Sequence, residues 1–182
     1  MDGKLKAILV GMMAGTMLDR EQLGFLWEMA LLAPAGIGVE CGVARGGSLL
    51  CWAAARGRRG HILAIDNGSL EGRWAFARDN LDRWGPQIIY FVGNSWELGA
   101  MMVRHQKVAF SFIDACHDEA GVGRDIEVWP KATMPGGIIT FHDYAARKCP
   151  DVKKCVDRWQ AKDPWEHLGT VGSTIAFRKP GG

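Results

Sequence analysis

The chain has 182 residues, of which 48% are hydrophobic, and this length is enough for one well-buried core but hardly enough for two. Its 22 basic and 20 acidic residues are scattered and leave a formal net charge of +2. Only residues 56–59 form a tight basic cluster, which is more typical of a helix end than of the basic face that nucleic-acid binding requires. We therefore expect a single domain over residues 1–182 with no nucleic-acid partner.

The five cysteines, at positions 41, 51, 116, 149 and 155, are odd in number and form no CxxC pair. This pattern argues against both a disulfide framework and a zinc site, and it indicates a reducing compartment. Residues 7–18 are uncharged and follow Lys4 and Lys6, but the run is too short to span a bilayer and has no clean cleavage signal. We expect a cytoplasmic protein with no membrane partner.

Strand-like and helix-like segments alternate along the chain, with glycine or an acidic residue at the junctions. From Asp19 onward, apolar residues at helical spacing predict an amphipathic helix in which Asp19 and Gln22 form the N-terminal capping box. Pro34 and Gly36 would end this helix. The next expected elements are strand 37–40, helix 46–56, strand 61–65, helix 74–84, strand 88–92, helix 96–105 and strand 108–113.

The second half of the chain continues this alternation and ends differently. The expected elements are a helix whose inner face carries Val122, Ile126 and Trp129, a turn at 134–137, a strand at 138–141, a helix from Pro150, and strands at 165–170 and 174–178. Gly172 and Ser173 separate the last two strands, which predicts a hairpin. The pattern predicts an α/β fold with a mostly parallel sheet, a C-terminal antiparallel hairpin and helices on both faces.

The first strand-to-helix junction is a glycine loop that runs from Glu40 through Gly42 to Ser48. Glycine lets the backbone approach a ligand closely, and the following helix offers free N–H groups at its positive end. The GxxxGG spacing does not fit the dinucleotide fingerprint GxGxxG, and Glu40 would repel a pyrophosphate but attract a cationic or zwitterionic ligand. A tight turn without a ligand is the alternative interpretation.

Polar residues also follow the second and third expected strands. Asp66 stands where an acid hydrogen-bonds ribose hydroxyls in nucleoside-binding α/β folds, although a solvated loop aspartate would look the same. Asn94 and Ser95 supply hydrogen-bonding groups, and Trp96 could stack on a base. Asn94 or Ser95 could instead only cap the next helix. Because the ends of parallel strands meet at one edge, these junctions outline an elongated nucleoside pocket.

The fourth and fifth strands also end at acidic residues. Asp114 follows the fourth strand, and His142 and Asp143 follow the fifth. Ligands in open α/β sheets bind outside the carboxyl ends of the strands, so these side chains should meet there, with His117 nearby. Such a set suggests metal-assisted chemistry with a titratable base. His117 could alternatively only hydrogen-bond a loop carbonyl.

These motifs resemble the class I S-adenosylmethionine-dependent methyltransferases, and more narrowly the metal-dependent small-molecule O-methyltransferases. The similarity extends from about residue 16 to residue 178 and is closest to the branch that includes macrolide sugar O-methyltransferases and cephalosporin hydroxylases. Its most specific part runs from Phe112-Ile-Asp-x-x-His-Asp-Glu-x-Gly121 to Pro135-Gly-Gly-Ile-Ile-x-Phe-His-Asp-Tyr144. The resemblance implies a Rossmann-like seven-stranded sheet and methyl transfer to a small hydroxylated molecule.

The resemblance also implies which residues bind the methyl donor. The first glycine loop, with Glu40, Gly42 and Ser48, would hold the amino-acid end of S-adenosylmethionine. Asp66 would contact the ribose, Asn94 and Ser95 would lie on the adenine side, and Asp114 would border the same pocket.

Metal ligation by Asp114, His142 and Asp143 is a further implication of the resemblance. Relatives often carry two acids or Asp-Asn where this chain has His142-Asp143, so the identity of the metal stays open. Oxygen-rich ligation with one imidazole favours Mg²⁺ or Mn²⁺ over iron. Some catechol-type relatives have a lysine base at the position of His117, which would here take the proton from the acceptor hydroxyl.

Acceptor pockets in this architecture are built from the N-terminal segment, here residues 1–18, and from loops at 67–73 and 145–150. Because these segments are short, we expect residues 1–18 to form a lid over a core of residues 19–182, and a homodimer could complete the acceptor site. Two other functions stay open at this point. They are a metal-independent methyltransferase and a non-catalytic S-adenosylmethionine-binding protein.

Overall fold

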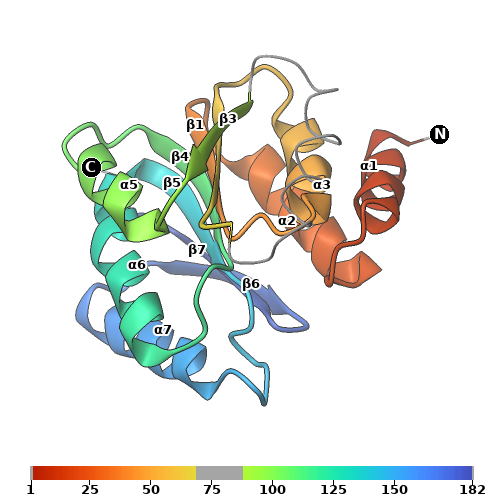
Figure 1. Cartoon of the computed structure of the whole chain (residues 1–182). Coiled ribbons are helices and arrows are strands. Elements are labelled where there is room, and N and C mark those ends of the chain that lie inside the picture. The colour runs from red at the N-terminus through yellow and green to blue at the C-terminus, as the bar shows by residue number, and fades with distance from the viewer. Residues whose placement is uncertain (1, 69–87, 182) are drawn as a thin grey trace.

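The computed structural model describes residues 2–68 and 88–181 and confirms the predicted α/β architecture. Its seven-stranded sheet has the order β3-β2-β1-β4-β5-β7-β6 (Figure 1). The strands are β1 (Ile37–Cys41), β2 (Ile62–Asp66), β3 (Ile88–Val92), β4 (Val108–Ile113), β5 (Thr133–Phe141), β6 (Glu166–Val171) and β7 (Thr174–Arg178). Strands β1 to β5 pair in parallel, and β7 pairs antiparallel with both β5 and β6, as the predicted hairpin requires.

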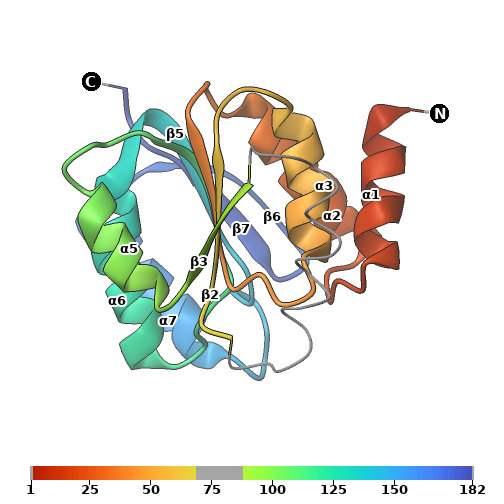
Figure 2. The same ribbon diagram turned by 45° about the horizontal axis from the view of Figure 1, so that its top comes forward.

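Helices cover both faces of this sheet (Figure 2). One face carries α1 (Gly3–Met13), α2 (Arg20–Leu32) and α3 (Gly47–Arg56), and the other carries α5 (Ser95–Met102), α6 (Glu119–Ala132) and α7 (Pro150–Lys162). Strands β2 and β4 are buried along their whole length, as expected for a parallel sheet between two helical layers. The helix predicted at 74–84 lies outside the described residues.

Each helical layer encloses its own apolar core against the sheet. Trp52 packs against Phe110 in one core, and Trp159 contacts Phe141 and Phe177 in the other. Burying a large apolar side chain contributes about 2 kcal/mol or more to stability. These rings therefore hold the helical layers in place, and Trp52 is part of the core, not a platform for a ligand.

Local sequence signals explain where most helices begin. Asp19 and Gln22 form the predicted capping box of α2, because the Asp19 side chain accepts from the Gln22 N–H at 2.8 Å and the Gln22 side chain accepts from the Asp19 N–H at 3.1 Å. Pro150 begins α7 as expected. Helix α5 ends at Met102, earlier than predicted, and Gln106 in the following turn has a φ of 43°. The helix-like sequence pattern at 96–105 therefore continues past the end of the helix in the structure.

Strand β5 differs from the prediction because it begins at Thr133 and contains the expected turn at 134–137. Val108 pairs with Thr133 and Phe110 pairs with Ile138, so β5 has more residues than β4 between these two pairs. The extra residues form an irregular stretch that includes Gly136, whose φ is 75°. The glycines bend the strand without ending it.

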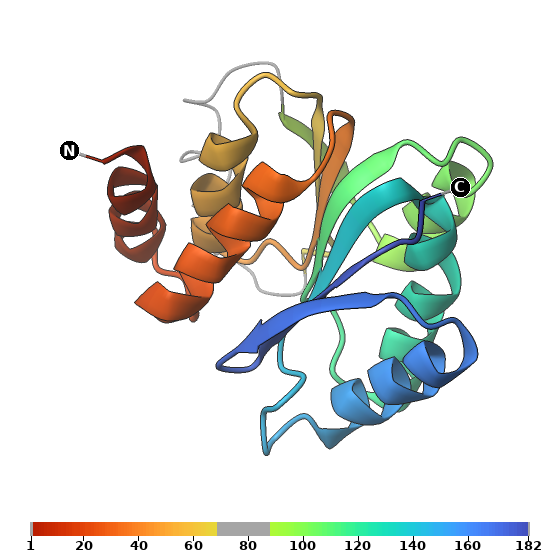
Figure 3. The ribbon, with the colours of Figure 1, turned by 180° about the vertical axis from the view of Figure 1, so that it is seen from behind.

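Figure 3 shows the side of the molecule where the β6–β7 hairpin and α1 lie. The hairpin turn reaches the start of α2, where the Gln22 side chain donates a hydrogen bond to Ser173 at 2.9 Å. Helix α1 packs closely against α3, because a Cβ atom on Gly47 would lie 2.6 Å from the Gly11 carbonyl oxygen. Among the described residues, the structure contains no helix with the length and apolar character needed to cross a bilayer.

Candidate functional site

A cleft lies at the carboxyl ends of the central parallel strands. Its lining residues are Met17, Gly42, Ala44, Ile65, Asp66, Asn67, Gly93, Asn94, Ser95, Trp96, Asp114, Ala115, Cys116 and His117. A second hollow shares Met17, Gly42, Ala44 and Asp114 with this cleft and extends to Ser48. The structure therefore brings most of the predicted cofactor-binding residues to one cleft.

The glycine loop is packed tightly against the end of β4. Gly42 has a φ of 87°, and a Cβ atom at this position would lie 2.1 Å from the carbonyl oxygen of Asp114. The Asp114 N–H donates to the carbonyl oxygen of Cys41 at 2.8 Å, which fixes the two strand ends together. Only glycine fits this conformation and this close approach. Gly42 thus places the loop backbone on the cleft wall beside Asp114.

Glu40 lies behind the cleft wall instead of facing the cleft. Its fully buried carboxylate accepts hydrogen bonds from the Ser48 hydroxyl at 2.7 Å and from the indole N–H of Trp52. Burial raises the pKa of Glu40 to about 8, although both hydrogen bonds favour the charged form. The sequence predicted that Glu40 contacts the ligand directly, but its buried carboxylate is bonded to Ser48 and Trp52. Glu40 instead orients Ser48, which does line the second hollow.

Asp66 joins two loops at the cleft. One carboxylate oxygen accepts from the Ala44 N–H at 3.0 Å and the other from the Gly68 N–H at 2.8 Å. Each carboxylate oxygen can accept more than one hydrogen bond, so acceptor capacity remains for a ligand hydroxyl. The predicted position of Asp66 on the pocket wall agrees with this geometry.

The segment after β3 forms another wall of the cleft. Asn94 occupies the N-cap position of α5, but its side chain donates to Glu97 at 3.0 Å and makes no capping bond. The Ser95 hydroxyl donates to Asp125, whose pKa is raised to about 6 by burial. The guanidinium of Arg124 lies 4.9 Å from the ring centre of Trp96. Asn94 and Trp96 therefore contribute to the wall, while the hydroxyl of Ser95 points to a buried acid.

Asp114, His117, His142 and Asp143 form a cluster at the rim of the cleft. His117 Nε2 lies 2.9 Å from Asp143 Oδ2, and His142 Nδ1 lies 3.1 Å from Asp114 Oδ1. The two remaining pairs, His117 with Asp114 and His142 with Asp143, are each 3.6 Å apart. Asp143 has a φ of 56°, in the left-handed region that Asp tolerates better than most residues. The predicted strand tips thus converge.

The acids and imidazoles of this cluster stabilise each other's charged forms. Burial opposes ionisation of Asp114, but its contacts with the rings of His117 and His142 outweigh burial and lower its pKa. The nearby Asp114 carboxylate is the main reason why the pKa of His117 is raised. Burial acts to lower the pKa of His142, yet Asp114 and Asp143 together raise it. The protonated imidazoles therefore balance the charge of the two carboxylates, and a metal ion that binds His142 would have to displace its proton.

The donor set of this cluster fits a divalent cation. Asp114, His142 and Asp143 each offer a ligand atom, and these atoms lie within 4.8 Å of one another. Two carboxylates with one imidazole suit Mg²⁺ or Mn²⁺, which prefer oxygen ligands. The residues that the resemblance assigns to metal ligation are thus able to hold one ion together.

Two residues that the sequence analysis did not single out as site residues support His142. The hydroxyl of Ser173, in the β6–β7 turn, lies 3.2 Å from His142 Nε2, and Gln22 in turn donates to Ser173. A partner on the second ring nitrogen fixes the orientation of a ligand imidazole. Ser173 is 31 residues from His142, and Gln22 is 151 residues from Ser173. No local sequence signal could have revealed contacts of this range.

Comparison with known proteins defines the class to which this fold and cleft belong. Residues 39–144 match a protein family described as a methyltransferase domain. This match covers more than half of the chain, so the chain belongs to the methyltransferase-domain family. The resemblance to S-adenosylmethionine-dependent methyltransferases seen in the sequence is thereby confirmed. No curated protein matches the chain.

Solved structures share this fold at low sequence identity. An O-methyltransferase from Bacillus cereus, in complex with SAH, is 21% identical with a TM-score of 0.69, and the alignment covers 98% of this chain and 92% of that one. TomG of Streptomyces achromogenes, in complex with SAM, is 17% identical with a TM-score of 0.68, covering 98% and 90%. CalS11, a TDP-rhamnose 3'-O-methyltransferase, is 19% identical with a TM-score of 0.68, covering 86% and 76%. These similarities show the common fold.

Proposed function

We propose that this protein is an S-adenosylmethionine-dependent O-methyltransferase that acts on a small hydroxylated molecule with the help of a divalent cation. The observation that carries the proposal is the position of Asp114. This residue lines the cleft formed by the glycine loop and by Asp66, and it also belongs to the set of metal-type ligands with His142 and Asp143. One rim therefore has room for a methyl donor on one side and a cation on the other.

The structural neighbours support the choice of methyl donor and acceptor class. The B. cereus protein is described in complex with SAH, and TomG in complex with SAM. All three neighbours named above are described as O-methyltransferases, and CalS11 is described as a TDP-rhamnose 3'-O-methyltransferase. In this chain, the loop backbone at Gly42 and the hydroxyl of Ser48 would hold the amino-acid end of the donor, and Asp66 and Asn94 its nucleoside.

The reaction needs a hydroxyl oxygen that has lost its proton next to a sulfonium methyl group. A divalent cation held by Asp114, His142 and Asp143 would supply the positive charge that lowers the pKa of such a hydroxyl. His117, which is about half exposed at the rim, would accept the proton on its ring nitrogen. Asp143 holds that ring at 2.9 Å and so fixes its direction, while Ser173 holds the ring of His142.

Two measurements on the wild-type protein test this function. Calorimetry with S-adenosylmethionine should show binding, and a panel of phenols and sugars with radiolabelled donor should reveal methyl transfer that increases when Mg²⁺ or Mn²⁺ is added. Absence of donor binding would remove every methyltransferase function. Transfer that is unchanged by chelation would favour the metal-independent alternative, and donor binding without transfer on any acceptor would favour a non-catalytic role.

The role of His117 gives a specific prediction. We expect His117→Gln to lower turnover by about 10²-fold, because a positioned general base contributes roughly this much. The wild-type rate should rise with pH as the ring of His117 loses its proton and becomes a base. The variant should lose this dependence. The exposed residue His105 provides the matched control, and His105→Gln should leave the pH–rate profile unchanged.

A further inference from the structure

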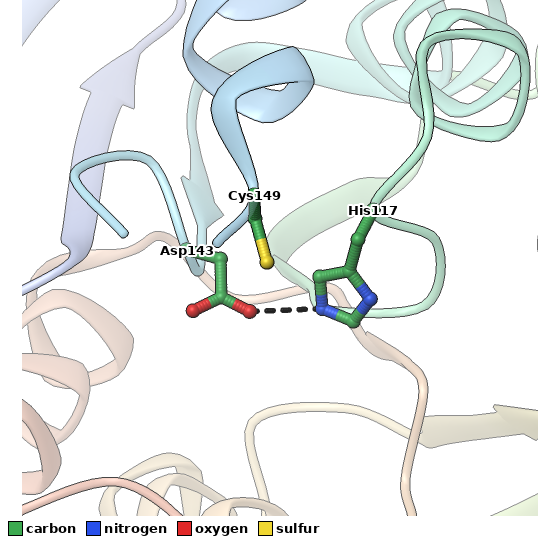
Figure 4. Close-up of side chains that lie close together, drawn as sticks. All are labelled: His117, Asp143 and Cys149. Atoms are coloured by element: carbon green, nitrogen blue, oxygen red, sulfur yellow. Dashed lines mark ion pairs between the residues drawn. The ribbon is translucent and has the colours of Figure 1, made fainter. Parts of the chain in front are cut away.

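The rim contains a second set of metal-type ligands that extends beyond the proposed reaction. His117, Asp143 and Cys149 each offer a ligand atom, and these atoms lie within 4.8 Å of one another. Figure 4 shows the Cys149 sulfur directed toward the space between the Asp143 carboxylate and the His117 ring, whose nearer nitrogen pairs with that carboxylate. The other set, Asp114, His142 and Asp143, is called the oxygen-rich set below. The two sets share Asp143, but the second one has the Cys149 thiol and the His117 ring in place of Asp114 and His142.

The three ligands come from three different parts of the fold. His117 follows β4, Asp143 follows β5, and Cys149 occupies the N-cap position of α7. The Cys149 side chain makes no capping hydrogen bond, so the sulfur is not required by the helix. The spacing of these residues gives no zinc-site motif, which is why the cysteine pattern alone argued against such a site. The tertiary structure brings them together.

This set prefers different metal ions from the set of Asp114, His142 and Asp143. A thiolate and an imidazole are preferred by Zn²⁺ and similar transition-metal ions, whereas Mg²⁺ prefers oxygen ligands. Ligands on one tetrahedral zinc ion are about 3.3 to 3.8 Å apart, so the set needs only small side-chain movements to bind an ion. Three protein ligands would leave a fourth position for water, and binding would displace the proton of the Cys149 thiol into solvent.

We propose that His117, Asp143 and Cys149 form a binding site for Zn²⁺ that competes with methyl transfer. An ion at this site engages the carboxylate of Asp143, which then cannot serve the oxygen-rich set of Asp114, His142 and Asp143, and the ring of His117, which then cannot act as the base. Zinc would therefore inhibit the protein even in the presence of excess Mg²⁺. The existence of the site does not depend on the proposed reaction, because its ligands are defined by their geometry.

Cobalt(II) is a suitable probe, because it binds zinc sites and gives a strong near-ultraviolet charge-transfer absorption when a thiolate is a ligand. Titration of the wild-type protein with Co²⁺ should produce this absorption, and added Zn²⁺ should abolish it. Cys149→Ser should not show it, and its affinity for Zn²⁺ by calorimetry should fall at least about 10-fold, since changes beyond the direct ligands already cost this much. Serine is favoured at an N-cap, so the variant is expected to fold.

A matched control is available on the same helix. Cys155 is buried in α7 and belongs to neither ligand set of the described residues, so Cys155→Ser should keep both the absorption and the zinc affinity. No thiolate absorption in the wild type, or an equal absorption in Cys149→Ser, would overturn the proposal. Neither readout requires catalysis, so a failed methyltransferase assay would leave this test intact. If transfer is observed, Zn²⁺ should inhibit the wild type more strongly than Cys149→Ser.

Discussion

Replacement of Asp143 by asparagine is expected to remove the metal-stimulated part of methyl transfer. Asp143 is the only residue shared by the two ligand sets among the described residues, and its Oδ2 atom lies 2.9 Å from His117 and 3.6 Å from His142. A metal ion typically contributes several kcal/mol to catalysis, so activity in saturating Mg²⁺ should fall by at least about 10²-fold. Calorimetry should show that the affinity for S-adenosylmethionine is nearly unchanged, because Asp143 does not line the cleft.

Asparagine is chosen because of the backbone at this position. Asp143 has a φ of 56°, which Asn adopts readily and Ala does not, so Asp143→Ala would add strain to the loss of charge. Asp143→Asn should also weaken Mn²⁺ binding measured by electron paramagnetic resonance. Asp151→Asn, which removes a carboxylate in the first turn of α7 outside both sets, serves as the control. Activity of Asp143→Asn that still responds to Mg²⁺ as in the wild type would exclude Asp143 as a ligand.

Replacement of Glu40 by glutamine is expected to stabilise the protein at alkaline pH. Because burial raises the pKa of Glu40 to about 8, the folded protein holds a proton that the unfolded chain releases at the ordinary value of 4.5. The proton that the folded protein keeps on Glu40 contributes its full stability below pH 4.5, the ordinary pKa of the carboxyl. This contribution is lost as the pH rises to about 8, the pKa of Glu40 in the folded protein. For the wild type, this loss is on the order of 3 kcal/mol between about pH 5 and pH 8.

The variant should lack this loss, because glutamine carries no charge and can keep both hydrogen bonds. Its amide oxygen can accept from Trp52 and its amide nitrogen can donate to Ser48, the partners of Glu40 in the structure. Urea denaturation at several pH values would measure the free energy of unfolding of both proteins. The control is Glu127→Gln at an exposed position of α6, which should follow the wild type. A Glu40→Gln variant with the pH dependence of the wild type would show that the buried carboxyl is not protonated.

Sequence reasoning was most successful where local chemistry dictates structure. The buried runs that end at Asp66, Asp114 and Asp143 predicted the strands and their common edge, because β-branched and aromatic residues favour a covered parallel sheet. The capping box of Asp19 and Gln22 fixed the start of α2. The bounds predicted for α5 and β5 were less accurate. Helical periodicity in a sequence can extend past the helix, and glycines can bend a strand without ending it.

The side-chain directions within the site required the tertiary structure. The sequence placed Glu40 in the glycine loop, but only the packing of α3 on β1 shows that its carboxylate turns inward to Ser48 and Trp52. The contact of Ser173 with His142 and the position of Cys149 depend on how the hairpin and α7 pack around the end of β5. By itself, the sequence determined which strands end in acids and hence the family and the edge that carries the site, because strand formation and strand ends depend on neighbouring residues. The tertiary structure decided which side chains share one ligand, because such contacts join segments that are distant in the chain and depend on the packing of whole helices against the sheet.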